Sequence, residues 1–283
     1  MKAFEIVYQV LEEMYGSVPG SAESDKDANV IAALDRYSAD YEDLKEKNTA
    51  DHSGHTSRFA YIYKYVPSHA NLVYNSIKNS AELLGLFDQD AVDVACFGGG
   101  PGSDLLGILK YLEESGKDPY VTCFLYDRER GWSNCWNDVG KKLPSGVRFS
   151  VAFEPVDVCN LGDLEYLQKC YTADLITMIF FASEVYALRD EATAFFERVF
   201  SNAKSGALFL YIDNGDQEGE FAKWMDGLTA TQGFEVIHDV TKKFPIYDRG
   251  EEMVALGRFL DKYRGKHHPK MKPYVTVKIY RKG

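Results

Sequence analysis

The feature that most constrains the fold of this chain is the regular alternation of strand and helix patterns after residue 90. Short apolar runs, many rich in Val, Ile, Phe and Tyr, are separated by longer amphipathic stretches. The predicted strands cover residues 91–97, 120–126, 147–153, 173–181, 206–212, 234–240 and 274–280. The first predicted helix of this part begins at Ser103, whose hydroxyl can cap it. Further helices are predicted over about 131–142, 189–203 and 217–232. This order predicts an α/β protein with a doubly wound, mostly parallel sheet.

The residues before this alternation follow a different pattern. Apolar positions recur at helical spacing through residues 1–88, and the stretch 51–57, Asp-His-Ser-Gly-His-Thr-Ser, interrupts them. Pro67 fits the first turn of the third helix. We therefore predict a helical N-terminal cap over residues 1–88 and an α/β domain over residues 89–283.

The α/β domain carries a basic insertion near its end. Residues 241–272 lie between the last two predicted strands and include one predicted helix, 251–265, so we expect a terminal antiparallel pair with an insertion. Residues 241–283 contain twelve Lys and Arg against four Asp and Glu, whereas the whole chain has a formal net charge of −11. A basic segment on an acidic body argues against a protein that binds phosphate over its whole surface.

Composition and cysteine spacing bound the protein class. Hydrophobic residues make up 45% of the chain and charged residues 27%, as in ordinary globular proteins. No apolar run reaches the roughly 18 residues of a membrane span, and Glu5, Glu12 and Glu13 interrupt the first apolar stretch, unlike a secretory signal. The five cysteines show no metal-binding spacing, so we expect reduced thiols and a cytoplasmic protein.

A cluster of glycines follows the first predicted strand: Gly98, Gly99, Gly100, Pro101 and Gly102. A turn needs one or two glycines, so this number indicates that something approaches the backbone closely. Ligands of open α/β sheets bind beyond the carboxyl ends of the strands, where the next helix offers unpaired N–H groups. Gly98, Gly100 and Gly102 are spaced as Gly-x-Gly-x-Gly. The dinucleotide-binding fingerprint, Gly-x-Gly-x-x-Gly, would need a glycine where this chain has Ser103.

This stretch resembles motif I of the class I S-adenosylmethionine (SAM) methyltransferases. In that family an acidic residue at the end of the second strand holds the ribose hydroxyls, and Asp127 occupies that position, followed by Arg128. After the third strand the family places an acidic or polar residue against the adenine amine. Asp157 matches it, with Val158 beside it as a backbone donor. The resemblance covers about residues 90–240.

The resemblance implies a seven-stranded Rossmann-like methyltransferase sheet and SAM as the cofactor. The cofactor-binding residues that it predicts are Gly98, Gly99, Gly100, Pro101, Gly102, Asp127, Arg128, Asp157, Val158 and Phe181. Cys96 departs from the pattern, because the family often has Asp or Glu two residues before the first glycine. Other groups are then expected to hold the methionine end of the cofactor.

The segment before the glycine cluster contributes predictions about the methyl acceptor. In the superfamily this segment often folds over the cofactor, and residues 55–74 are rich in aromatic side chains with polar tips. Tyr61 and Tyr65 are expected to bind a small or cationic acceptor. His69 is expected to act as a base for a hydroxyl or thiol, with Tyr65 as a second catalytic candidate. We predict transfer to a small-molecule N, O or S acceptor.

The segments after the fourth and fifth strands complete the predicted site. Glu184 is a catalytic candidate, and Tyr186, Asp213 and Asn214 are candidates for substrate binding. These segments lack both the Asp/Asn-Pro-Pro-aromatic motif of amino-directed DNA methyltransferases and the cysteine nucleophile of pyrimidine C5 enzymes. Asp213 and Asn214 resemble half of the Mg²⁺ site of catechol-type O-methyltransferases, but Glu184 stands at another offset, so no metal is predicted.

Besides a protein acceptor in place of a small molecule, two alternatives remain open. Residues 261–272, here called the basic segment, contain five Lys and Arg that could contact RNA phosphates, as in an enzyme that methylates a ribosomal RNA base. A SAM-binding protein without methyl-transfer activity is the second alternative.

Overall fold

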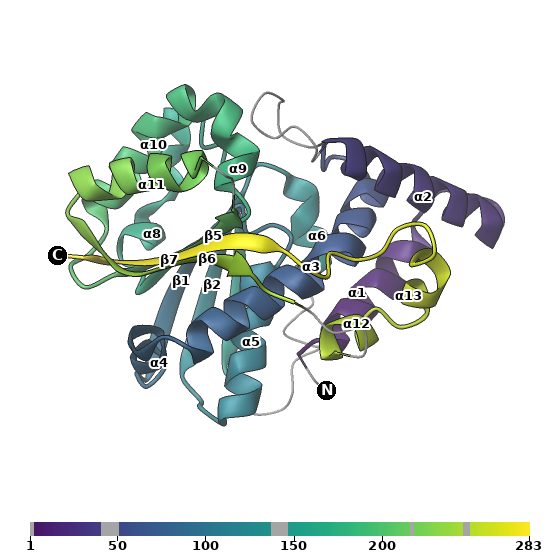
Figure 1. Cartoon of the computed structure of the whole chain (residues 1–283), viewed down its shortest axis with the longest axis horizontal. Helices are drawn as coiled ribbons and strands as arrows, with labels where there is room; N and C mark the ends of the chain where they lie inside the picture. The colour runs from purple at the N-terminus through teal and green to yellow at the C-terminus, as the bar shows by residue number, and fades with distance from the viewer. Residues whose placement is uncertain (1–2, 41–50, 137–146, 216–217, 246–249) are drawn as a thin grey trace.

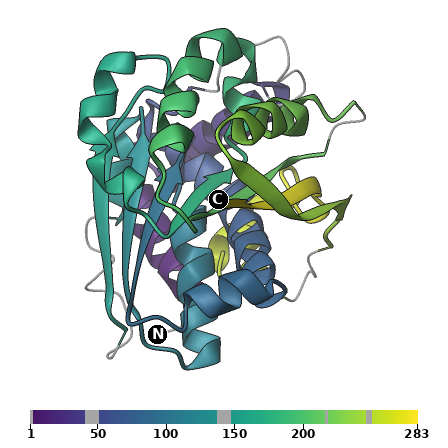
Figure 2. The same ribbon diagram turned by 90° about the vertical axis from the view of Figure 1, so that its left-hand side faces the viewer.

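The computed structural model describes residues 3–40, 51–136, 147–215, 218–245 and 250–283 of the chain. Within these residues a seven-stranded sheet forms the centre, in the order β3-β2-β1-β4-β5-β7-β6 (Figure 1). The strands are β1 (Ala91–Phe97), β2 (Tyr120–Asp127), β3 (Phe149–Pro155), β4 (Leu175–Ile179), β5 (Leu208–Asn214), β6 (Phe234–Lys243) and β7 (Tyr274–Lys282). The first five strands are parallel, and β7 runs antiparallel between β5 and β6. Figure 2 shows how strongly the sheet twists toward β6 and β7.

The two faces of the sheet belong to two hydrophobic cores. In β1 the side chains of Val92, Val94 and Cys96 enter one core, and those of Ala95 and Phe97 enter the other. Because successive side chains of a strand point to opposite faces, a strand covered on both sides must be apolar throughout. This burial explains the short apolar runs that predict the strands.

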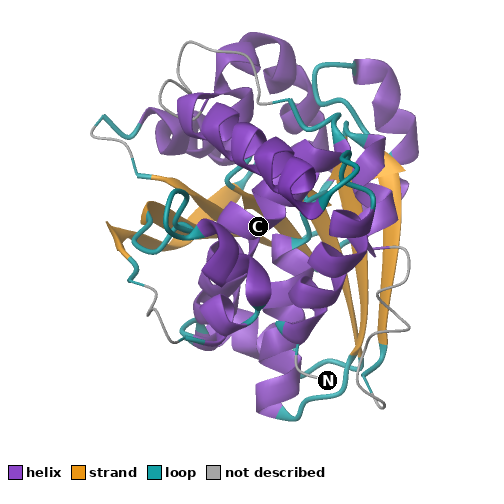
Figure 3. Ribbon diagram, turned by 90° about the vertical axis from the view of Figure 1, so that its right-hand side faces the viewer, coloured by secondary structure: helices purple, strands orange, loops and turns teal. Residues whose placement is uncertain are grey.

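Helices cover both faces of the sheet (Figures 1 and 3). One face carries α8 (Gln168–Tyr171), α10 (Arg189–Asn202) and α11 (Glu220–Thr231). The other carries α3 (His55–Lys78), α4 (Ala81–Leu86) and α5 (Ser103–Ser115), with α1 (Glu5–Gly16) and α2 (Glu23–Asp40) packed against α3. Short turns follow the strand ends: η1 (Arg130–Trp132), α6 (Ser133–Trp136), η2 (Leu161–Tyr166), α9 (Ala182–Val185) and η3 (Tyr186–Leu188). None of the helices in the described ranges is long and apolar enough to cross a membrane.

All seven predicted strands are present, with ends within three residues of the predicted ones. Two predictions about helix ends are wrong. Gly102, with φ +83°, holds the N-cap position of α5, and Ser103 is the first helical residue, its hydroxyl buried without a partner. Pro67 lies in the interior of α3, because that helix already begins at His55. The predicted helix over 131–142 is described only as far as residue 136.

The insertion between β6 and β7 folds back onto the cap. The single helix predicted over 251–265 is two short helices, α12 (Glu251–Val254) and α13 (Arg258–Tyr263). Gly257 separates them with φ +52°, and a side chain there would collide with the ring of Tyr8 in α1. Arg258 binds Glu12 of α1 through two hydrogen bonds of 2.7 Å. The insertion therefore joins the last part of the chain to the first.

Candidate functional site

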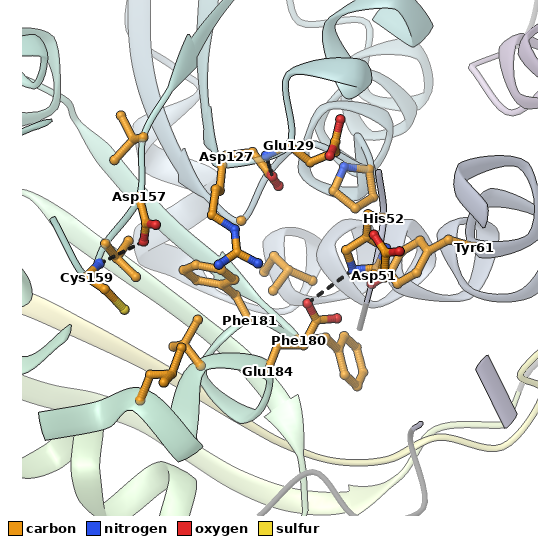
Figure 4. Close-up of a pocket in the computed structure, with 18 of the residues that line it drawn as sticks. Asp51, His52, Tyr61, Asp127, Glu129, Asp157, Cys159, Phe180, Phe181 and Glu184 are labelled. Atoms are coloured by element: carbon orange, nitrogen blue, oxygen red, sulfur yellow. Dashed lines mark hydrogen bonds and ion pairs between the residues drawn. The ribbon is translucent and has the colours of Figure 1, made fainter. Parts of the chain in front are cut away.

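A pocket of about 320 Å³ opens at the carboxyl ends of β1, β2 and β4 (Figure 4). This volume and this place in the sheet are typical of small-molecule sites in α/β proteins. The cap contributes the loop before α3 and one residue of that helix, and the remaining residues follow strand ends. The lining residues are Asp51, His52, Ser53, Tyr61, Gly98, Pro101, Asp127, Arg128, Glu129, Val156, Asp157, Val158, Cys159, Ile179, Phe180, Phe181, Glu184, Val185 and Leu188.

The glycine cluster forms the floor of this pocket and its support. Gly98 and Pro101 face the pocket, and a Cβ on Gly98, whose φ is +66°, would lie 2.4 Å from the ring of Phe181. Gly99 and Gly100 lie outside the lining. A Cβ on Gly100 would lie 2.3 Å from the Trp132 side chain. Aromatic side chains thus pack directly on the bare backbone of the loop.

Gly102 also lies outside the lining, and its bare backbone supports Trp136. A Cβ there would lie 2.3 Å from the indole, whose Nε1–H donates to the carbonyl of Gly100 at 2.8 Å. At each of the three alternating glycines a different aromatic side chain therefore occupies the space that a Cβ would need.

Asp127 ends β2 and presents its carboxylate to the pocket. Its Oδ2 accepts the N–H of Gly100 at 3.1 Å, and its Oδ1 accepts the N–H of Glu129 at 2.9 Å. Each carboxylate oxygen can accept two hydrogen bonds, so one position remains on each. Burial raises the pKa of Asp127 to about 6. At neutral pH this carboxylate is ionised and can accept from two adjacent hydroxyl groups.

The other predicted cofactor residues after β2 and β3 also line the pocket. Asp157 and Val158 follow β3, and the Asp157 carboxylate accepts the N–H of Cys159 at 3.0 Å. The N–H of Asp157 is itself fixed, because it donates to Asp163 at 2.8 Å. Arg128 lines the same end of the pocket. Figure 4 shows Asp157 and Cys159 at one end and His52 and Tyr61 at the other.

The end formed by the cap carries an ion pair. His52 Nε2 lies 3.6 Å from Glu184 Oε2, and its Nδ1 lies 2.6 Å from the Tyr37 hydroxyl. Burial lowers the pKa of His52, but the hydrogen bond and charge of Glu184, with the charges of Asp127 and Asp51, outweigh burial and raise it above its ordinary value. His52 therefore keeps its proton to a higher pH than an ordinary histidine does, beside the Glu184 carboxylate.

His69 and Tyr65 lie behind the pocket wall. The ring of His69 stacks on that of Phe180, with centroids 3.7 Å apart, and on that of Tyr65 at 5.6 Å. His69 is buried, its Nε2 has no hydrogen-bond partner, and burial and the charge of Lys270 lower its pKa well below the ordinary value. Neither residue lines the pocket, whereas Phe180, on which His69 stacks, does, so their roles in catalysis remain predictions. Tyr61, one helical turn earlier, does line the pocket.

Asp213 and Asn214, at the end of β5, lie beneath this wall and outside the lining. The Asp213 carboxylate accepts the backbone N–H of Ser183 at 2.9 Å and that of Asn214 at 2.6 Å. Tyr186 points away and packs edge-on against Phe221. Within the described ranges no three His, Cys, Asp or Glu side chains lie close enough together to hold a metal ion.

Beneath the glycine loop lies a carboxylate that the sequence did not single out. Asp104, in the first turn of α5, is 2% exposed, and its Oδ1 has no hydrogen-bond partner. It lies near Cys96 and Thr177, and burial raises its pKa to about 6. This group faces the inside of the protein rather than the pocket.

Sequence reasoning missed the loop before α3, which supplies Asp51, His52 and Ser53 to the pocket. This loop had been interpreted only as an interruption of helical spacing. A usable signal is present, because His52 stands among short polar residues immediately before the segment expected to cover the cofactor. Glu129 and Phe180 were missed as well, although each lies next to a predicted site residue.

Parts of the basic segment are engaged in internal contacts. Lys262 pairs with Asp27 of α2 at 2.9 Å, and His267 lies 3.2 Å from Asp35. Lys270 is directed at the pocket wall, where its Nζ donates to Asn214 at 3.1 Å. These contacts reduce the positive charge that the segment can offer to an external partner.

No protein-family model matches the sequence, and no curated protein matches it either. Similar solved structures include an O-methyltransferase family protein from Burkholderia thailandensis, with 13% identity, a TM-score of 0.49, and coverage of 93% of this chain and 74% of that one. A SAM-dependent methyltransferase from Methanosarcina mazei has 11% identity, a TM-score of 0.42, and coverage of 71% and 96%. The [4+2]-cyclase SpnF has 14% identity, a TM-score of 0.44, and coverage of 94% and 97%.

The fold itself follows from the topology of the sheet. Five parallel strands in the order β3-β2-β1-β4-β5 continue into an antiparallel β7 that is inserted before β6. The glycine cluster sits at the end of β1, at the point where the strand order reverses. The chain has the Rossmann-like fold of the class I SAM-dependent methyltransferases.

Proposed function

We propose that the pocket binds SAM and that the protein is a SAM-dependent methyltransferase acting on a small-molecule acceptor. The observation that carries this proposal is the Asp127 carboxylate at the end of β2. Its two backbone hydrogen bonds fix its orientation and leave one acceptor position on each oxygen. Two such positions match the vicinal hydroxyls of a ribose.

Other features of the pocket support the same ligand. Asp157 and Val158 line the pocket with Asp127, and hydrogen bonds fix both the N–H of Asp157 and its carboxylate, as a site for an adenine edge requires. The aromatic ring of Phe181 offers an apolar surface beside Gly98. The lining contains five carboxylates against one arginine and one histidine. A ligand with a sulfonium and an ammonium group fits this charge better than an anion does.

The residues of this chain would serve mainly to position the reactants. When bound, SAM supplies a methyl group on a positively charged sulfur, which an acceptor displaces in line. The protein aligns the acceptor and excludes water from it. Glu184 and His52 lie at the cap end of the pocket and can take up the proton that a hydroxyl or ammonium acceptor must lose.

A small acceptor is favoured over RNA by the surroundings of the pocket. The cap covers the pocket, and its lining is acidic. The basic segment, which would have to contact phosphates, has Lys262 paired with carboxylates of α2 and Lys270 bound at the pocket wall. RNA binding would therefore have to rely on Arg264, Lys266 and Lys272.

The proposal is tested by calorimetric titration of the wild-type protein and of Asp127→Asn with SAM. Asn keeps one acceptor oxygen and loses the other, and a charge-assisted hydrogen bond is worth roughly 1.5–3 kcal/mol, so we expect the variant to bind at least about tenfold more weakly. Asp118→Asn is the matched control, because that carboxylate is 60% exposed and lies away from the pocket. Absence of binding by the wild-type protein would refute the cofactor assignment.

Activity is tested separately by incubating the protein with SAM and a metabolite extract. Mass spectrometry should show S-adenosylhomocysteine together with a compound that has gained one methyl group. Binding without any S-adenosylhomocysteine would indicate a SAM-binding protein that does not transfer methyl groups. Methylation of added RNA, abolished by charge reversal at Lys266, would favour the RNA alternative.

A further inference from the structure

The basic segment (residues 261–272) runs from the cap to the wall of the pocket. The Tyr63 hydroxyl of α3 donates to the carbonyl of His267 at 3.0 Å. Three residues later the backbone N–H of Lys270 donates to the carbonyl of Lys64 at 2.9 Å. Two consecutive residues of α3 therefore fix the path of the segment where it approaches the sheet.

The docking point coincides with the proline inside α3. Pro67 has no N–H to donate, and its ring crowds the preceding turn, so backbone hydrogen bonding of the helix is interrupted there. The donor that Pro67 lacks would serve the carbonyl of Tyr63, and the next carbonyl in this turn, that of Lys64, accepts the N–H of Lys270 from outside the helix. Pro67 thus lies in the turn of α3 that binds the backbone of the basic segment.

The side chain of Lys270 reaches the residue that closes the pocket. Its ammonium donates to Asn214 Oδ1 at 3.1 Å and lies 4.2 Å from the centroid of the Phe180 ring. Burial lowers the pKa of Lys270 to about 8, and the charges of Asp213 and Glu184 act against this decrease. At pH 7 the ammonium is therefore charged and faces an aromatic ring, which is a favourable cation–π arrangement.

Phe180 needs such a contact, because its backbone is strained. Its φ of +54° is the only positive value at a non-glycine residue in the described part of the chain. A bulky residue in this region is held there by its surroundings. The N–H of Phe180 donates to Ile212 at 2.7 Å, and its ring stacks on His69. Lys270 adds the contact that comes from the C-terminal part of the chain.

We propose that Lys270 is a positioning residue of the pocket, whose ammonium holds the Phe180 ring in place as the wall of the cap end. The basic segment delivers this side chain to the wall, which gives Lys270 a role that needs no nucleic-acid partner. A chain that needed only packing at this position would be served better by an apolar residue, since a buried ammonium is costly. The expected effect of Lys270 on ligand binding rests on the proposed function, whereas its contact with the Phe180 ring does not.

The experiment compares Lys270→Gln, Lys270→Arg and Lys272→Gln in the full-length protein. Gln keeps a donor for Asn214 but removes the charge, Arg keeps the charge, and Lys272 is the matched control, an exposed lysine of the same segment. Calorimetry with S-adenosylhomocysteine should show binding about tenfold weaker for Lys270→Gln. Lys270→Arg should recover most of the affinity, and Lys272→Gln should bind as the wild type does.

A double-mutant cycle with Phe180→Leu tests the contact without any ligand. In urea unfolding, the effect of Lys270→Gln on the unfolding equilibrium constant should change about tenfold when Phe180 is replaced. Additive effects would overturn the inference, and so would wild-type affinity in Lys270→Gln. If the wild-type protein fails to bind S-adenosylhomocysteine, the proposed function fails, and the cycle alone then supports or overturns the role of Lys270.

Discussion

Asp104 provides a test of the buried electrostatics beneath the glycine loop. Its carboxyl is 2% exposed, one oxygen has no hydrogen-bond partner, and burial raises its pKa from 3.8 to about 6. Between about pH 4 and pH 6 the folded protein therefore keeps a proton that the unfolded chain releases. Stability falls as pH rises through this range, because the unfolded chain binds fewer protons. Above pH 6 the folded state carries the full cost of the buried charge.

The size of this cost follows from the shift in pKa. A pKa difference of roughly 2 between the folded and unfolded states corresponds to about 3 kcal/mol in the free energy of unfolding. Asp104→Asn keeps the shape of the side chain and removes the charge. The free energy of unfolding of the variant, relative to the wild type, should therefore grow by about 3 kcal/mol between pH 4 and pH 7. Asp127 and Asp213 titrate in the same direction, but they contribute equally to both proteins and cancel in the difference.

Urea unfolding at half-unit pH steps measures this difference. Asp118→Asn, which removes an exposed carboxylate, serves as the control for general effects of lost charge. A difference between Asp104→Asn and the wild type that stays constant from pH 4 to pH 7 would show that Asp104 ionises as easily in the folded protein as in the unfolded chain. The effect of burial on the Asp104 carboxyl would then be refuted.

Three further results are expected. Gly98→Ala should lower the free energy of unfolding by about 1–3 kcal/mol in urea and abolish ligand binding in calorimetry, because its φ is +66° and the new Cβ would overlap the Phe181 ring. Glu184→Gln should lower stability at pH 6 but have little effect once the pH lies well above the folded-state pKa of His52, because the raised pKa means that the ion pair contributes its full stabilisation below the unfolded-state pKa of about 6.5 and loses it as pH rises through the folded-state pKa; urea unfolding over a pH series measures this. Wild-type affinity for S-adenosylhomocysteine should fall as pH rises through about 8, where Lys270 loses its proton, and calorimetry of Lys270→Gln should show no such fall. Asp213, Glu184 and Lys64 also face this ammonium, so their charges set the pH at which the affinity falls but not whether it falls.

The sheet could be predicted from the sequence because its strands are buried on both faces. Burial of this kind requires uninterrupted apolar runs, and turn residues mark their ends. β1 (Ala91–Phe97) agrees with the prediction to the residue. β4 was predicted to extend through residue 181 but ends at Ile179, because Phe180 adopts a positive φ. No local pattern announces a phenylalanine in that conformation, since contacts with distant residues hold it there.

The sequence predicts, for the same local reason, several residues that line the sheet end of the pocket. Gly98, Pro101, Asp127, Asp157 and Val158 all line the pocket, and each lies within a few residues of a strand end. The cap end depends on contacts between segments that are distant in the sequence. His52 enters the pocket from a loop between helices, and its partner Glu184 follows β4. Helical spacing in the cap says nothing about where that loop will lie on the sheet.

The depth of the pocket is decided by Phe180 rather than by the cap helix. Tyr61 and Tyr65 lie on one side of α3, about 6 Å apart along its axis, so sequence spacing makes them equivalent candidates. Tyr61 lines the pocket, whereas Tyr65 lies one turn further along, beside His69 and behind the Phe180 ring. An acceptor could therefore meet Tyr65 and His69 only if that ring moved. Access of an acceptor to His69, the predicted base, and the cation–π contact of Lys270 thus both depend on the side chain of Phe180. Under the proposed function, substitution of Phe180 should change acceptor binding before it changes the proposed contacts of Asp127 with SAM.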